Sequence, residues 1–265
     1  MSVAIRTFIA GIIVPGLGYW IIGERKLGVA TGILFSASIL IFSWTRLVLD
    51  PIGLRVLLII LLATLVGGAL HAAIVESRSA EIHRSWKSAL FFAVAFVITL
   101  LLLLSNRGMI LGYETYKLPT QSMSPTLLRG DYIIVDTWRY RDEEPANGDI
   151  VVFKAPQSGI NFIKRIAGLA GDSISLQGNQ LSRNGQIVSE PYAVYEGSGG
   201  AFQPVPELTI PPNQYFLLGD NRNKSADSRQ FGFVPRENII GRIAHIYYSS
   251  DDEVGIRWSR FPTEF

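Results

Sequence analysis

Cysteine is absent from the 265 residues, and histidine occurs only three times. After residue 106 the sole histidine is His245, which lies in the alternating stretch RIAHIYY. A thiol nucleophile is therefore excluded, and no cluster of histidine and aspartate has the spacing of a zinc site. A histidine-based triad would depend on His245 alone, and in such a pattern we expect that side chain to pack within a strand or to face water. We expect no metal and no cofactor.

Charge is also scarce, because only 17% of the residues are charged, compared with roughly 25% in soluble domains. Three runs with almost no charge are each long enough to cross a bilayer, which takes a helix of roughly 20 residues: Leu27 to Thr45, Val56 to Val75 and Ser88 to Asn106. An earlier run from Thr7 to Gly23 is shorter and contains Pro15, so a re-entrant or tilted segment is as consistent with it as a full span. We expect residues 1–106 to form a membrane region with three to four hydrophobic segments.

Basic residues in the short connections predict the orientation of these spans, because lysine and arginine collect in cytoplasmic loops. Arg25 and Lys26 precede the second run, and the connection from Glu76 to Lys87 holds three basic residues. Both connections are expected on the cytoplasmic side, which places the chain after Asn106 on the external face. The formal charge of +2 includes no basic stripe, so no nucleic-acid partner is expected.

After residue 106 the chain consists of short β-branched segments separated by glycine, proline, asparagine and aspartate, which is typical of strands of about five to seven residues. The segments are DYIIVD, DIVVF, NFIKRIA, DSISL, QYFLL and RIAHIYY. In LSRNGQIV, Asn184 and Gly185 favour a tight hairpin turn. The stretch from Glu196 to Pro212 is rich in glycine and proline, and we expect a loop or peripheral ribbon there. The predicted fold is mixed, with N-terminal transmembrane α-helices followed by a mainly-β exported domain of residues 107–265.

Two polar residues stand in unusual settings. Ser122 lies in LPTQSMSPTL, where Pro119 and Pro125 bracket a polar run. Because proline fixes φ and disfavours helix at the residue before it, the serine is expected on a rigid turn, although most such turns are ordinary loops. Lys164 shares one face of the strand-like NFIKRIA with Phe162. A lysine becomes a general base only when desolvation lowers its pKa, and a solvated strand lysine is the commoner alternative.

A third polar element is the stretch GDNRNKSADSRQFGFVP, in which Asp220, Arg222, Asp227 and Arg229 fall within ten positions. Such density suggests a loop held by charged hydrogen bonds. Taken alone, the stretch is also compatible with an ordinary polar loop or with a calcium loop. The interspersed arginines and Lys224 argue against a cation site.

Together the stretches PTQSMSPTL, NGDIVVF, IKRIAGLAGDSI and GDNRNKSADSRQFGFVP resemble the motifs of the type I signal peptidases, in the family's order and at plausible spacing. These are membrane serine proteases that remove leader peptides from exported proteins. The resemblance extends from about Tyr116 to Gly241. It implies that Ser122 is the nucleophile and Lys164 the general base of a serine endopeptidase that needs no cofactor.

The resemblance also implies roles for other residues. Ser225 would orient the lysine amine, and the hydroxyl of Thr120, where the family usually has serine, would help the Ser122 backbone N–H to hold the oxyanion. A second departure is Ala170, where the family usually has proline, and this change removes no catalytic group. Structural ion pairs and their charged loop would involve Arg165, Asp220, Arg222, Asp227 and Arg229. Shallow apolar pockets for small residues one and three positions before the cut would involve Tyr116, Leu118 and Ile163.

The resemblance therefore predicts a multi-pass protein of the bacterial cytoplasmic membrane whose external catalytic domain, residues 107–265, cleaves signal peptides. Its expected partners are membrane lipid and preproteins with small residues at positions −1 and −3. Two alternatives stay open: a protease dedicated to the maturation of one precursor, and a non-catalytic membrane scaffold whose β domain binds partners. The presence of Ser122, Lys164 and Ser225 together weighs against the scaffold.

Overall fold

A computed structural model describes residues 3–78, 86–195, 204–251 and 253–265. The chain divides into two compact units, Met1–Gly112 and Tyr113–Phe265. This boundary lies six residues beyond the predicted end of the membrane region at Asn106, because a short helix α6 (Arg107–Ile110) follows helix α5 (Trp86–Ser105) and belongs to the first unit. Residues of the predicted cytoplasmic connection from 79 to 85 lie outside the described part of the chain.

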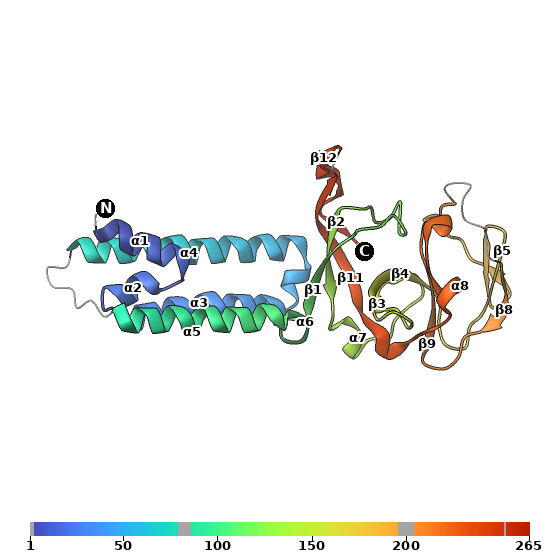
Figure 1. Ribbon diagram of the computed structural model, residues 1–265, viewed down its shortest axis with the longest axis horizontal. Coiled ribbons are helices and arrows are strands. Elements are labelled where there is room, and N and C mark those ends of the chain that lie inside the picture. Colours follow the sequence, from blue (N-terminus) through green and yellow to red (C-terminus); the bar gives the residue numbers. More distant parts are fainter. Residues whose placement is uncertain (1–2, 79–85, 196–203, 252) are drawn as a thin grey trace. The chain divides into compact units, whose positions relative to one another are not determined.

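The first unit is helical (Figure 1). Its described residues include three helices long and apolar enough to cross a membrane, Arg25–Trp44, Pro51–Ser77 and Lys87–Ser105. These spans lie within α3 (Arg25–Trp44), α4 (Pro51–Arg78) and α5 (Trp86–Ser105), with a short 3-10 helix η1 (Leu47–Leu49) before α4. Large apolar side chains such as Leu62 and Phe91 are exposed on them. Because a helix that is apolar on all sides matches lipid rather than water, this unit is that of a membrane protein.

The first hydrophobic run does not form one continuous helix. It is divided into α1 (Val3–Ile13) and α2 (Leu17–Ile21), because Pro15 cannot continue a helix and Gly16 adopts the left-handed conformation with φ of 86°. The 11 residues of α1 extend only roughly 16 Å, about half the thickness of the bilayer core. The break excludes a single spanning helix and agrees with the re-entrant or tilted alternative.

The second unit is mostly antiparallel β-structure (Figure 1). Its main sheet has nine strands in the path β1-β2-β11-β3-β4-β9-β10, with β12 and β13 also paired to β11, and a smaller sheet has the order β7-β6-β5-β8. The main-sheet strands are β1 (Tyr113–Lys117), β2 (Asp131–Asp136), β3 (Ile150–Lys154), β4 (Asn161–Gly168), β9 (Gln214–Leu218), β10 (Val234–Pro235), β11 (Ile239–Asp251), β12 (Gly255–Ile256) and β13 (Thr263–Glu264). The smaller sheet has β5 (Ser173–Gln177), β6 (Gln180–Arg183), β7 (Gln186–Ile187) and β8 (Val205–Thr209).

All six predicted strand segments are strands in the structure, and the predicted turn at Asn184 and Gly185 joins β6 to β7. One expectation needs correction. Val205–Thr209, within the stretch expected to be a loop or ribbon, forms strand β8 because it pairs with β5. Residues 196–203 of that stretch lie outside the described residues. Short helices complete the unit: α7 (Arg139–Asp142), η2 (Arg222–Lys224), α8 (Ser228–Phe231), η3 (Arg236–Asn238) and η4 (Trp258–Arg260).

Strand β3 shows how the sheet supports the site. Ile150 and Val152 pack into one hydrophobic cluster, whereas Val151 and Phe153 pack into another on the opposite face. Because successive side chains of a strand point to opposite faces, the centre of the sheet is covered on both sides. All four side chains are almost completely buried. Strand β4 pairs with β3 and therefore lies on a rigid base.

Candidate active site

Ser122 lies on the turn that connects β1 to β2. The backbone N–H of Leu118 donates to Asp131 and that of Gly130 donates to Leu118, so the two ends of the connection are fastened together. Met123 is 2% exposed and anchors the turn in the hydrophobic cluster beneath it. The turn is therefore rigid around Ser122, which is itself buried.

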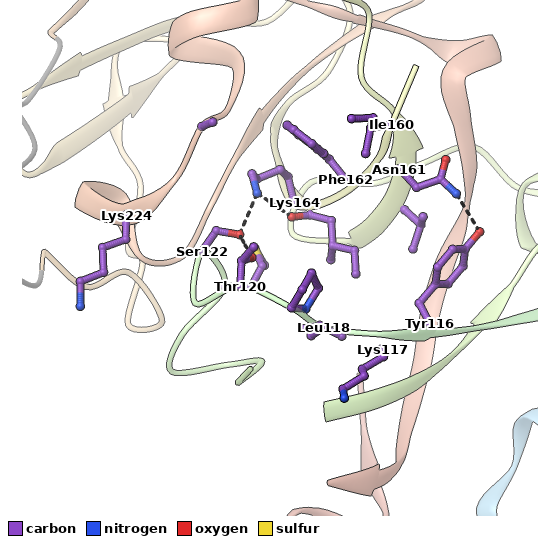
Figure 2. Close-up of a pocket in the computed structure, with 15 residues that line it drawn as sticks. Tyr116, Lys117, Leu118, Thr120, Ser122, Ile160, Asn161, Phe162, Lys164 and Lys224 are labelled. Carbon is purple, nitrogen blue, oxygen red and sulfur yellow. Dashed lines mark hydrogen bonds between the residues drawn. The ribbon is translucent and has the colours of Figure 1, made fainter. Parts of the chain in front are cut away.

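Lys164 of β4 lies beside this serine (Figure 2). Its Nζ donates to Ser122 Oγ at 2.9 Å and to the Ile163 carbonyl at 2.9 Å. The amine also lies 5.5 Å from the centre of the Phe162 ring. The lysine is only 4% exposed, so the alternative of a solvated strand lysine is wrong. A serine hydroxyl and a lysine amine in direct contact have the geometry of a nucleophile and its base.

Burial lowers the pKa of Lys164 from its ordinary value of 10.5 to about 8, because a charged amine loses its hydration there. The carboxylates of Asp227 and Asp220 act in the opposite direction by favouring the ammonium, and the Arg229 guanidinium lowers the pKa further. Desolvation is the largest of these effects. The amine is therefore neutral in an appreciable fraction of molecules near neutral pH, as a general base requires.

The hydroxyls of Thr120 and Ser225 differ in their contacts. Thr120 Oγ1 is 3.3 Å from Ser122 Oγ, and a dashed line joins the two side chains in Figure 2. Ser225 is buried, and its hydroxyl makes no hydrogen bond to any described residue, including Lys164. A Cβ placed on Gly219 would lie 2.1 Å from Ser225 Oγ and 2.6 Å from the Ser122 carbonyl oxygen, so glycine is needed for this close packing. The roles implied for Thr120 and Ser225 stay predictions.

The charged residues of the stretch GDNRNKSADSRQFGFVP form buried ion pairs. Arg165 holds Asp220 with two hydrogen bonds, Nε to Oδ1 at 2.9 Å and Nη2 to Oδ2 at 2.7 Å. Arg229 likewise binds Asp227 through Nε at 2.7 Å, and Asp227 also accepts from the Gly219 N–H at 3.0 Å. Such two-point pairs fix the direction of both side chains. They hold the loop after β9 against the strand that carries Lys164.

Arg222 has a partner that the sequence did not indicate. Its Nη2 contacts Glu190 Oε1 at 2.7 Å, and the two side chains are 1% and 7% exposed. Burial opposes the charged form of Arg222, but hydrogen bonding to Glu190 and the charge of Glu190 prevail, so the pKa of the arginine is raised. Neither local pattern nor the resemblance pointed to Glu190, because it lies in a polar connection more than 30 positions from its partner.

An open cleft of about 450 Å³ begins at the dyad and is largely apolar. It is bounded by the connection after β1 on one side and by the first half of β4 on the other (Figure 2). The residues implied for substrate pockets all line it: Tyr116, Leu118 and Ile163. Thr120, Ser122 and Lys164 also line it, so the catalytic groups and the apolar surface share one cavity.

Other chemistries find no support around this cleft. Among the described residues, no group of three or more His, Cys, Asp or Glu side chains is placed to hold a metal. His245 lies in β11, where it pairs with Ile134 and Glu264, and it is 1% exposed. It does not belong to the residues that line the cleft. Its packing within a strand matches the expectation from sequence.

Activity is expected to depend on pH through Lys164, since only the neutral amine can accept the serine proton. With a pKa of about 8, kcat/KM should rise about tenfold per pH unit below that value and level off above it. The measurement is a pH–rate profile from pH 6 to 10 at constant ionic strength. A midpoint near 10 would mean a solvated lysine, and one near 6.5 would indicate a histidine.

The same pKa shift affects stability. The pKa of Lys164 is about 8 in the folded protein and about 10.5 in the unfolded chain, so between these pH values the unfolded state binds more protons at this residue. Lys164 therefore makes the free energy of unfolding rise with pH over this range.

Comparison with known proteins gives the family that the sequence motifs resemble. The family model described as signal peptidase, peptidase S26, matches residues 85–248. A probable signal peptidase I-2 of Synechocystis is 40% identical over 135 residues, which cover 49% of this chain and 60% of the relative. Signal peptidase I of Leptolyngbya laminosa is 40% identical over 137 residues, covering 49% and 66% respectively. The chain thus spans less than two thirds of the length of these two relatives.

A third relative is covered almost completely. Signal peptidase I of Bacillus licheniformis is 33% identical over 174 residues, which cover 61% of this chain and 90% of the relative. The family match includes the serine turn, the lysine strand and the charged loop, and it extends over more than half of the chain. The chain therefore belongs to the signal peptidase family, peptidase S26.

Proposed function

We propose that this protein is a membrane-bound signal peptidase that hydrolyses the peptide bond between a signal peptide and the mature part of an exported preprotein. The observation that carries the proposal is the buried contact of 2.9 Å between Lys164 Nζ and Ser122 Oγ at the end of an apolar cleft. A binding scaffold has no use for a desolvated lysine aimed at a serine. Membership of the family supports preproteins as the class of substrate.

In the first step, neutral Lys164 takes the proton from Ser122 as Oγ attacks the carbonyl carbon of the scissile bond. The resulting ammonium gives this proton to the nitrogen of the leaving peptide, and an acyl-enzyme remains. Lys164 then removes a proton from a water molecule, which attacks the ester and releases the signal peptide with a free carboxylate. The Lys164 ammonium returns this proton to the departing Ser122 Oγ, so the hydroxyl and the neutral amine are restored without a cofactor.

The oxyanion of each tetrahedral intermediate would be held by the Ser122 backbone N–H and the Thr120 hydroxyl. The distance of 3.3 Å between Thr120 Oγ1 and the attacking oxygen supports this role. Thr120 is exposed while Ser122 is buried, so a bound peptide would have to cover this turn before the donors act with water excluded, where they are worth most.

The strands explain how a peptide would bind. In the described part of the chain, strand β1 pairs with β2 and ends the path of the main sheet, and the Asn161 to Lys164 half of β4 pairs with β3. Each strand therefore lies at a sheet edge along this stretch, and an extended peptide can add to such an edge through main-chain hydrogen bonds. Alternate side chains of that peptide, at −1 and −3, would face the apolar wall formed by Leu118, Ile163 and Tyr116. The resemblance to the family implies small residues at these two positions.

We assign the protein to the bacterial cytoplasmic membrane as a multi-pass protein with its catalytic unit on the external face. Support comes from the three candidate spans and from the basic residues Arg25 and Lys26 at the start of α3. Lysine and arginine at a span end favour the cytoplasmic side. Three spans that begin there finish outside, where preproteins emerge, and membrane lipid is the natural partner of the exposed apolar helices.

The direct test is incubation of the purified full chain, in detergent or liposomes, with a preprotein whose signal peptide ends in Ala-x-Ala. We expect one cut after the second alanine, located by N-terminal sequencing of the product. A matched preprotein with leucine at −1 should be cut poorly, and Ser122→Ala should give no product. A panel of unrelated preproteins then separates general leader removal from maturation of a single precursor. Absence of cleavage across the whole panel by the folded parent protein would contradict the proposal.

A further inference from the structure

The segment that follows β7 in the smaller sheet, residues 188–195, lies directly against the loop from Gly219 to Ser225. The Val194 N–H donates to the Asp220 carbonyl at 2.8 Å, and the Arg222 N–H donates to the Val194 carbonyl at 2.8 Å. These bonds form a parallel bridge between Val194 and Asn221. The next contact reaches the nucleophile, because the Asn221 N–H donates to the Ser122 carbonyl at 3.1 Å. The segment is thus one layer away from the reacting serine.

Glu190 fastens this segment to the loop by charge. Its Oε1 lies 2.7 Å from Arg222 Nη2, and both side chains are almost completely buried. Arg222 Nε in turn donates to the Gly219 carbonyl at 3.2 Å, and Arg229 Nη2 donates to the Arg222 carbonyl at 2.6 Å. A buried arginine that has lost its counter-charge strongly destabilises the folded state. Glu190 therefore determines where Arg222 and the loop around it settle.

The same carboxylate is connected to the strand of the base. The Tyr192 hydroxyl donates to Glu190 Oε1 at 3.1 Å. The Tyr192 ring lies over Arg165, with the guanidinium carbon 3.8 Å from the ring centre. Such a stacked arrangement is favourable and directional. Arg165 follows Lys164 in β4. Glu190 is therefore linked through Tyr192 to the strand that carries Lys164, and through Arg222 to the loop from Gly219 to Ser225.

We propose that Glu190 is a positioning residue of the active site, which through Arg222 and Tyr192 holds the Gly219 to Ser225 loop against Ser122 and the Lys164 strand. This inference deepens the proposed peptidase activity and rests on it. Glu190 does not line the cleft, so it acts through other residues. Its loss lets the loop withdraw, admits water to Lys164 and lengthens the contact between Nζ and Oγ. Misplacement of a catalytic group by about 1 Å costs on the order of 100-fold in rate.

The test compares Glu190→Gln and Glu190→Asp with a matched control, Asp172→Asn. Asp172 precedes β5 of the same smaller sheet, where it accepts from the Leu169 N–H and from Asn184, and it contacts neither Arg222 nor Tyr192 in the described structure. For each variant we would measure kcat, KM, the pH–rate midpoint and the melting temperature, with rates taken well below the melting temperature. The substrate is the Ala-x-Ala preprotein.

For Glu190→Gln we expect a roughly 10- to 100-fold lower kcat with KM within about twofold of the parent. Water around Lys164 favours its charged form, so the pH–rate midpoint should move upward, toward the ordinary pKa of lysine. The groups that face this amine, Asp227, Asp220 and Arg229, are unchanged in the variant. Glu190→Asp keeps the charge and should recover part of kcat, whereas Asp172→Asn should lower only the melting temperature.

Three results would overturn the inference: parent-like kcat in Glu190→Gln, an equal loss of kcat in Asp172→Asn, or a loss of kcat with an unmoved pH midpoint. If Glu190→Gln is not recovered in folded form, Tyr192→Phe decides, because it removes one hydrogen bond and keeps the ring on Arg165. A lower kcat at unchanged KM then supports the positioning role, and a parent-like kcat rejects it. Failure of the parent itself to cleave any preprotein would instead reject the proposed function.

Discussion

Replacement of Lys164 by alanine is expected to abolish processing, with kcat lowered by about 10⁴-fold or more, and Ser122→Ala should have an effect of the same size. The two side chains form one unit, because the hydroxyl attacks only while the amine 2.9 Å away removes its proton. Effects of residues that act as a unit do not add. The double variant should therefore be no worse than either single variant.

Single-turnover cleavage of a preprotein is the measurement, together with circular dichroism to establish that each variant is folded. Lys164→Ala leaves a cavity in a buried place, so Lys164→Met serves as a control that fills the same volume without an amine. Below pH 8 this control should also melt at a higher temperature than the parent, since burying a charged amine is unfavourable. Appreciable cleavage by Lys164→Met, or loss of cleavage in a stable His245→Ala variant, would contradict the dyad.

The strands that carry the site could be predicted because their sequences are locally consistent. DYIIVD and DIVVF contain consecutive β-branched residues bounded by aspartate, and both are covered on two faces in the structure. The rigid turn of Ser122 also followed from local features, namely Pro119 and Pro125. Where a segment's own side chains decide its conformation, reading the sequence is sufficient.

Other elements depend on partners far away in the chain. Strand β8, VPELT, contains proline and glutamate, residues that strands avoid, and it is a strand because β5 pairs with it. Glu190 likewise has no local sign of importance, since a glutamate between serine and proline is ordinary for an exposed connection. Its burial arises only when Arg222 is brought against it by the fold. Such tertiary pairings are what a single sequence does not contain.

The site itself was only partly accessible from sequence. The four motifs, in the family's order, predicted which residues form the site but not the distances between them. Ser122, Lys164 and the Gly219 to Ser225 loop come from three separate segments that the main sheet joins. The Ser225 hydroxyl, expected beside the lysine amine, makes no hydrogen bond to it here and packs against Gly219 instead. The sequence patterns do not specify such side-chain contacts.

Thr120→Val is expected to lower kcat by roughly 100- to 1,000-fold, or about 3 to 4 kcal/mol of transition-state stabilisation. Valine has nearly the shape of threonine but no hydroxyl, so the change removes a donor to the oxyanion without opening a cavity. Because the oxyanion exists only after attack, the loss should appear in kcat, with KM little altered. Steady-state kinetics on the Ala-x-Ala preprotein would measure both constants.

Thr120→Ser is the matched control, because it keeps the hydroxyl and removes only the methyl group. It should stay within about tenfold of the parent, the main change being the freer rotation of an unbranched side chain. The pair of variants thereby separates the hydroxyl from the methyl group at a position where this chain departs from its family. Thr120 Oγ1 lies 3.3 Å from Ser122 Oγ, so its hydroxyl is close to the atom whose attack forms the oxyanion. Near-parent kcat in Thr120→Val would show that the Ser122 N–H works with another donor, and Thr120 would then be only a packing residue of the turn.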